Sequence, residues 1–72
     1  MTETQRITLE FLQFFFEKYN KAPTYAEIAK AFNIRDGAAF ERVLRLATQG
    51  YVRQGRGHRN IAILRRTDGT QP

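Results

Sequence analysis

A helix-start signal and a turn signal lie close together near the middle of the chain and constrain its fold most. Pro23 and Thr24 are followed by Glu27, and a threonine three residues before a glutamate is a capping box, in which each side chain bonds the other residue's free backbone N–H group. Residues 33–37, Asn-Ile-Arg-Asp-Gly, indicate a tight turn, because asparagine tolerates a left-handed backbone. We therefore expect a short helix that ends near Phe32 and a further helix only a few residues later.

The helix after this turn is expected over residues 37–48. Asp36 is placed to cap its N-terminus, and Gly50 ends it. The helical period predicts an inward stripe made of Ala39, Val43, Leu46 and Ala47.

A longer helix precedes this pair, from Glu3 to about Tyr19. Its apolar side chains fall on two overlapping stripes that merge into one wide face, and polar residues occupy the remainder. The polar residues are Gln5, Glu10, Gln13 and Glu17. Asn20 suits a left-handed C-cap, and the proline just beyond it cannot continue the helix.

Two short strand-like segments follow the helices. Residues 51–54 and 59–64 flank a glycine-containing basic turn at 55–58. The order helix, short helix, tight turn, helix, hairpin predicts a mainly α protein with a small β-hairpin, a three-helix winged helix-turn-helix. We assign residues 1–64 to this domain and expect residues 65–72 to form a flexible C-terminal tail.

The charge of the chain is divided unevenly between its halves. Up to Ile34 four basic residues balance four acidic ones, whereas from Arg35 onward eight arginines face three acidic residues, so that this half carries the whole net charge of +5. Arginine presents a planar fork that matches phosphates and guanine edges. The segregation favours a polyanion-binding surface over the alternative of a merely soluble basic surface.

The composition argues against catalysis, metal binding and membrane insertion. The chain has no cysteine, no serine and one histidine, and its carboxylates are scattered, so we expect no catalytic site, metal, cofactor or small-molecule substrate. No apolar run approaches the ~20 residues that span a bilayer, and residues 1–6 lack the order of a signal peptide. We expect a cytoplasmic protein with a single core.

Four segments, in the same order, resemble the N-terminal DNA-binding domain of the LexA repressor family. They are Gln5-x-x-x-Leu9-x-Phe11-Leu12-x-x-Phe15-Phe16, Pro23-Thr24-x-x-Glu27-Ile28-Ala29 with Phe32-Asn33-Ile34-Arg35, Val43-x-x-Leu46-x-x-x-Gly50-Tyr51-Val52, and Arg59-x-Ile61-x-Ile63. The resemblance extends over residues 5–64 and implies a winged helix-turn-helix that binds DNA. The family's self-cleaving C-terminal domain has no counterpart here, and a chain without serine cannot supply its Ser–Lys chemistry.

The chain departs from the family pattern at the start of the third helix. Residues 36–39 look one residue shorter than usual, and Asp36 stands where a serine is common. Arg42 and Val43 replace a usual His-Leu pair, and Phe40 occupies a position that is normally polar and faces the bases. The family's operator sequence is therefore not carried over to this chain.

The third helix holds the residues expected to read bases. Arg42 is the leading candidate, because its fork matches guanine O6 and N7. Ala38 can touch a thymine methyl group, Glu41 can accept from cytosine N4, and Arg45 is expected nearer to phosphate. The alternative is a solvated helix face with a Glu41–Arg45 ion pair.

Backbone contacts are expected at the start of the second helix and in the turn after it. Thr24 and Tyr25 carry hydroxyl groups beside free N–H groups that suit a phosphate, and Arg35 lies in the following turn. The alternatives are capping alone for Thr24 and packing alone for Tyr25. In the wing, residues 53–59, the expected contacts are Arg53, Arg56, His58 and Arg59, and the favoured alternative for His58 is an ordinary turn residue.

Surplus apolar side chains lie on the first and third helices. Phe40 and Leu44 are four residues apart, and we expect them to pack against Phe14 and Phe15 of the first helix. Alternatively, part of this set is exposed and makes a protein contact.

These features predict a sequence-specific double-stranded DNA-binding regulator, in the simplest case a repressor. Since one such domain buries a modest interface, a second copy is expected on DNA, and the phenylalanine-rich helix could pair two copies. The alternative is a winged-helix module that inhibits or adapts a protein partner.

Overall fold

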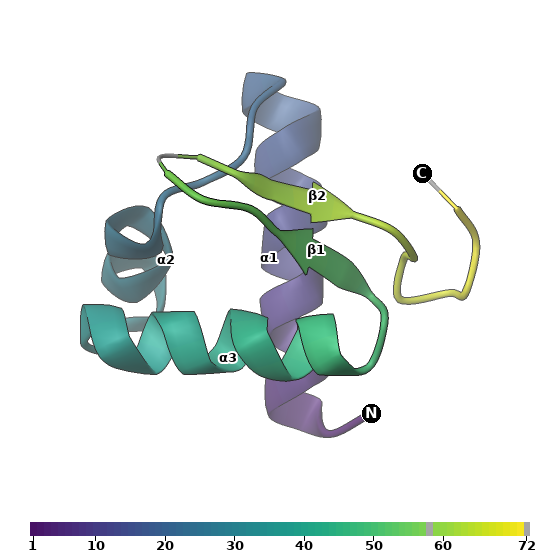
Figure 1. Ribbon diagram of the computed structural model, residues 1–72, viewed down its shortest axis with the longest axis horizontal. Helices are drawn as coiled ribbons and strands as arrows, with labels where there is room; N and C mark the ends of the chain where they lie inside the picture. The colour runs from purple at the N-terminus through teal and green to yellow at the C-terminus, as the bar shows by residue number, and fades with distance from the viewer. Residues whose placement is uncertain (58, 72) are drawn as a thin grey trace.

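The computed structural model describes residues 1–57 and 59–71 and confirms the predicted fold class. Three helices, α1 (Glu3–Tyr19), α2 (Tyr25–Phe32) and α3 (Asp36–Thr48), precede a two-stranded hairpin of β1 (Val52–Gln54) and β2 (Ile61–Ile63). α1 runs behind the other elements, and α3 crosses in front of it with the hairpin above (Figure 1). The molecule is a mainly α winged helix-turn-helix.

Local capping explains where α1 and α2 begin and end. The Thr24 hydroxyl accepts from the Glu27 N–H at 3.1 Å, and the Thr24 N–H donates to the Glu27 carboxylate at 2.8 Å, which confirms the predicted capping box. Asn20 and Asn33 end the two helices in the left-handed conformation, with φ of 56° and 55°. Short-range chemistry therefore fixes these boundaries.

The start of α1 holds a second capping box that the sequence analysis missed. The Thr2 hydroxyl accepts from the Gln5 N–H at 3.2 Å, and the Gln5 side chain accepts from the Thr2 N–H at 3.0 Å. Gln5 is consequently buried rather than placed on the polar face of the helix. The signal was present, because glutamine serves the third position of such a box as glutamate does.

Asp36 does not cap α3 as expected. The N-cap is Arg35, whose backbone is extended at φ −79° and ψ 157°, and it makes no side-chain cap hydrogen bond. Asp36 is instead the first helical residue, where its negative charge favours the positive end of the helix dipole. The helix begins one residue earlier than expected because Arg35 takes the extended conformation before it, and Asp36, which has the better capping side chain, is already helical.

The core lies where α3 crosses α1 and the hairpin covers both. Buried side chains come from every element, and the largest fully buried ones are Leu9, Leu12, Ile28, Val43, Leu46 and Val52. The predicted inward positions Ala39, Val43 and Leu46 are buried, whereas Ala47 is half-buried. Phe11 of α1 meets Phe32 of α2 edge to face, with ring centroids 5.4 Å apart, which joins the first two helices.

The hairpin is antiparallel and shorter than expected. Val52 pairs with Ile63 and Gln54 with Ile61, so β2 begins at Ile61, two residues later than expected, and ends at Ile63. Arg59 has a left-handed backbone at φ 54°, which cannot continue a strand. In the turn Gly57 has a positive φ of 90°, a conformation that favours glycine.

The segment after β2 contacts α1. The guanidinium of Arg66 lies 2.8 Å from the carboxylate of Glu17, and the Thr67 N–H donates to the Gln13 side chain at 2.8 Å. The flexibility expected of this tail stays a prediction. Within residues 1–57 and 59–71, no helix combines the length and apolar character needed to cross a bilayer.

Candidate nucleic-acid interface

Three elements meet on one face of the molecule, which we call the wing face: Thr24 and Tyr25 of α2, Phe40 and Leu44 of α3, and hairpin turn residues 55–57. The rings of Tyr25 and Phe40 pack edge to face with centroids 5.3 Å apart. The Gln54 side chain donates to the Tyr25 hydroxyl at 2.9 Å, which ties β1 to the same point. Tyr25 therefore links all three elements.

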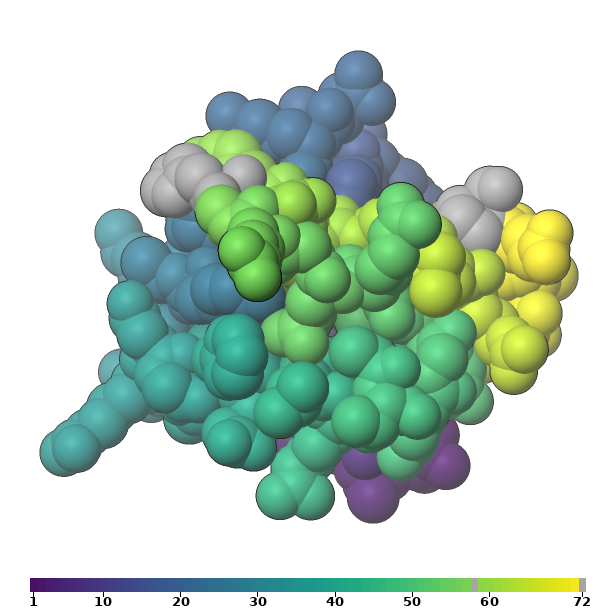
Figure 2. All heavy atoms as spheres, viewed as in Figure 1, coloured from purple at the N-terminus to yellow at the C-terminus, as the bar shows by residue number. Residues whose placement is uncertain are grey.

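The space-filling view shows this side of the molecule. Atoms of α3 and of the hairpin cover most of it, and those of α1 are visible mainly at its edges (Figure 2). Leu44 lies one helical turn beyond Phe40 on the same side of α3. This is the side of the helix that points away from the core.

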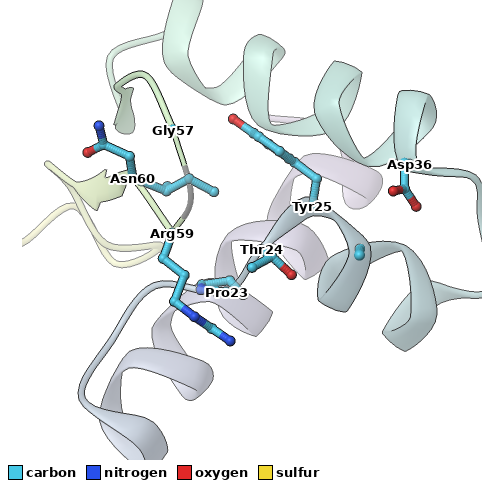
Figure 3. Close-up of a pocket in the computed structure, with 9 residues that line it drawn as sticks. Pro23, Thr24, Tyr25, Asp36, Gly57, Arg59 and Asn60 are labelled. Atoms are coloured by element: carbon cyan, nitrogen blue, oxygen red, sulfur yellow. The ribbon is translucent and has the colours of Figure 1, made fainter.

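A cleft of about 240 Å³ separates the start of α2 from the hairpin. Thr24 and Tyr25 lie on one side of it, and Gly57, Arg59 and Asn60 on the other (Figure 3). The capping box satisfies the backbone N–H groups of Thr24 and Glu27, so those of Tyr25 and Ala26 are the ones that helix geometry leaves without acceptors inside the helix. The phosphate contact expected at the start of α2 stays a prediction.

Arg59 is engaged within the protein, across this cleft. Its guanidinium donates to both carboxylate oxygens of Glu27, at 2.7 and 3.1 Å, and to the Ala22 carbonyl at 3.0 Å. The bond from Arg59, followed by the Thr24 N–H, lowers the pKa of Glu27 from 4.5 to about 2. Arg59 therefore fixes the hairpin against the start of α2, a positioning role that the sequence analysis missed, and its contact with DNA stays a prediction.

Arg42 points away from the wing face. Its guanidinium carbon lies 4.9 Å from the centre of the Phe32 ring, and its Nη1 lies 3.5 Å from the Thr8 hydroxyl oxygen. The side chain is half-buried between α3, α2 and α1. Base reading by Arg42 stays a prediction, and it would require this side chain to leave both contacts.

The other predicted base-reading residues are exposed on α3. Ala38, Glu41 and Arg45 all lie on its solvent side. Glu41 and Arg45 also line a shallow hollow with Thr2 and Thr4 of the opposite end of α1, so they lean away from the hairpin. The alternative Glu41–Arg45 pair is not among the ion pairs of the described residues.

Three arginines are exposed around the wing face. Arg35 lies at the start of α3, while Arg53 and Arg56 lie on the hairpin, where alternation along β1 turns Arg53 outward. In the described part of the chain none of these three forms an ion pair. They are the exposed guanidinium groups beside the wing face, and Arg45 and Arg65 are exposed elsewhere. His58 lies outside the described residues.

The comparisons with known proteins show the family of this chain. The family model of the LexA DNA-binding domain matches residues 1–59.

The chain belongs to the LexA DNA-binding domain family.

A LexA repressor of Pseudothermotoga lettingae is 28% identical to this chain over 68 residues, which are 94% of the chain and 34% of the relative. The chain therefore spans about a third of the length of the curated relative it matches. The family resemblance noted in the sequence is confirmed, and this family is defined by DNA binding.

In this LexA-family domain the surplus apolar residues do not pack as expected. Phe40 rests on Tyr25 rather than on α1, and Phe40 and Leu44 remain 44% and 36% exposed. Phe15 is buried and so is unavailable for a protein contact, whereas Phe14 is 53% exposed. The helical period alone could not predict that Phe15 is buried and Phe14 is exposed, because the apolar face of α1 is wider than the core it covers.

No group of three or more histidine, cysteine, aspartate or glutamate side chains is gathered within residues 1–57 and 59–71. The polar groups of the wing face are instead hydroxyl, guanidinium and backbone N–H donors, which suit phosphate oxygens.

Proposed function

We propose that this domain binds double-stranded DNA with sequence preference and serves as the DNA-binding part of a transcriptional repressor. Membership of the LexA family supports the partner, and the name of the relative supports the regulatory role. The single observation that carries the mode of binding is the wing face, where the start of α2, the outward side of α3 and the hairpin turn adjoin.

In the proposed complex the helix over residues 37–48 enters the major groove, and the wing over residues 53–59 follows the backbone or the minor groove. Thr24, Tyr25 and Arg35 hold phosphates. Arg53 and Arg56 act in the wing, and base edges are approached from α3. The candidates for base contacts are Ala38, Glu41, Arg45 and, after a rearrangement, Arg42.

Selection from random duplexes, followed by gel shift and salt titration, tests the proposal. If about five phosphates are neutralised, the logarithm of the binding constant should fall with the logarithm of salt concentration with a slope of about −4 to −5. Enrichment of one sequence supports a specific regulator. No retarded DNA at low salt, or equal affinity for all duplexes, would contradict it.

A second candidate function rests on the exposure of Phe40 and Leu44. Apolar side chains on an otherwise polar helix face suit a module that inhibits or adapts a protein partner. Binding of one protein in the absence of DNA binding at low salt would favour this function.

Pairing of two copies on DNA is a further part of the proposal. Because Phe15 is buried, the aromatic surface of α1 available for pairing is centred on Phe14, with Tyr19 also 48% exposed. Analytical ultracentrifugation that shows a monomer both free and on DNA would remove this part. The cytoplasmic location expected from the sequence stays a prediction.

A further inference from the structure

The flank of α3 that carries Phe40 and Leu44 has few free hydrogen-bonding groups, because the hydroxyl of Thr48, one turn further on, donates to the Arg45 carbonyl at 2.8 Å. Phe40 and Leu44 occupy it, and Gly37, one turn before Phe40 and Glu41, adds no side chain. The arginines of α3 lie elsewhere: Arg42 stacks on Phe32, and Arg45 leans toward the start of α1. A helix of this kind has little on its wing side with which to donate to guanine or adenine.

The Phe40 ring is held in place rather than free to move. It packs on Tyr25, whose hydroxyl accepts from Gln54, so α2 and β1 both support its position. Leu44 extends the apolar surface by one helical turn. A supported apolar surface can make a selective contact, because little side-chain freedom is lost when it binds.

The apolar feature of the major groove is the C5-methyl group of thymine, and it is the group that apolar side chains contact there. We infer that this domain reads thymine methyl groups through Phe40 and Leu44, so that its preferred site carries thymines where α3 meets the groove. This inference rests on the proposed DNA-binding function and names its specificity determinants.

DNA is favoured over a protein as the occupant of this surface by the charges around it. Arg35, Arg53 and Arg56 are exposed and unpaired among the described residues, which suits phosphates on either side of a groove. An apolar centre with a cationic border is complementary to a thymine-rich groove and its two backbones.

The test removes single methyl groups from the DNA and leaves the protein unchanged. The probe is the tightest duplex recovered from a random pool, in which thymines are replaced one at a time by deoxyuridine, which has the same base-pairing groups and no methyl. We expect the full chain to bind about fourfold more weakly when a contacted methyl is removed, and to bind unchanged at other positions.

Protein variants assign the effect to residues. Phe40→Ala should weaken binding to the thymine duplex and abolish the difference between thymine and deoxyuridine at one position, and Leu44→Ala should do so at a neighbouring position. Leu64→Ala is the matched control, because Leu64 is similarly exposed but lies after β2 and has no assigned role in binding. It should keep the full deoxyuridine effect.

The outcomes separate this inference from the proposed function. Salt-dependent binding with no deoxyuridine effect at any position, or an effect that survives in both Phe40→Ala and Leu44→Ala, overturns methyl reading and leaves DNA binding intact. No binding of any duplex at low salt contradicts the proposed function itself. Thermal unfolding of each variant shows whether a loss of binding reflects a loss of fold.

Discussion

At the residue scale, Arg59 and Glu27 join the two sides of the candidate interface. Glu27 performs two tasks, since its carboxylate closes the capping box with Thr24 and accepts both bonds from Arg59. Neither side chain is fully buried, with exposures of 38% for Glu27 and 30% for Arg59, so water weakens the pair. The role of the pair is therefore to hold the wing in position, and its electrostatic contribution to stability should be modest.

The lowered pKa of Glu27 predicts an acid-dependent part of the stability. Because its pKa is about 2 in the folded chain and near 4.5 ordinarily, the stabilisation is complete above pH 4.5 and is lost as the pH falls toward 2. In Arg59→Gln this acid-dependent part should shrink, as measured by urea unfolding at a series of pH values.

Arg53→Gln is the control for this prediction, because it removes the same charge from the hairpin without breaking an ion pair of the described residues. It should keep the dependence of the unmodified chain. Identical profiles for the unmodified chain and Arg59→Gln would show that Arg59 does not set the pKa of Glu27.

At the scale of elements, the start of α2 both begins a helix and forms one side of the cleft opposite the hairpin. Thr24 caps α2, as Thr2 caps α1, and the two capping boxes have the same bonds. Only the box at Thr24 lines the cleft opposite the hairpin. A comparison of the two threonines can therefore distinguish the effect of a capping box on stability from an effect on DNA binding.

Replacement of either threonine by alanine should lower the free energy of unfolding by about 1 kcal/mol through loss of a capping bond. Thr24→Ala should also weaken DNA binding, since a hydroxyl and an ordered helix start are lost beside the proposed phosphate. Gel shift and chemical unfolding measure the two effects. Equal DNA affinities for Thr2→Ala and Thr24→Ala would place the phosphate contact elsewhere.

At the scale of the whole molecule, the arginines divide into two groups. Arg6, Arg59 and Arg66 are engaged by carboxylates, and Arg42 is engaged by an aromatic ring. The other arginines are exposed: Arg35, Arg53 and Arg56 near the wing face, and Arg45 and Arg65 elsewhere. The surface that is available to a polyanion is therefore smaller than the count of arginines suggests.

Removal of two wing charges together should change the salt dependence of binding. In the double variant Arg53→Gln/Arg56→Gln, the slope of the logarithm of the binding constant against the logarithm of the salt concentration should become less steep by about 2. Each phosphate contact contributes about 0.9 to this slope. Arg6→Gln, on α1 with Glu3 and Glu10 as partners, should leave the slope unchanged. An unchanged slope in the double variant would exclude the wing from the DNA contact.

Two parts of the structure could be predicted from short stretches of sequence. The capping box at Thr24 and the left-handed Asn20 and Asn33 depend only on residues a few positions apart, and the predicted helix boundaries held there. α3 begins one residue earlier than predicted because Arg35, rather than Asp36, has the extended backbone conformation.

The orientation of long side chains could not be predicted in the same way. Arg59 bonds a carboxylate 32 residues earlier, and Arg42 approaches a threonine 34 residues earlier, so both directions depend on how the helices and hairpin pack. Likewise, the wide apolar face of α1 did not indicate that Phe15 would be buried and Phe14 exposed.

By itself the sequence determined the order of elements, the ends of the first two helices and the location of the charge, because capping, periodicity and charge are properties of neighbouring residues. Only the tertiary structure decided which arginines are free and which aromatic rings face outward. The physical reason is that a flexible side chain takes the partner that packing brings near it, and packing is set by the whole chain.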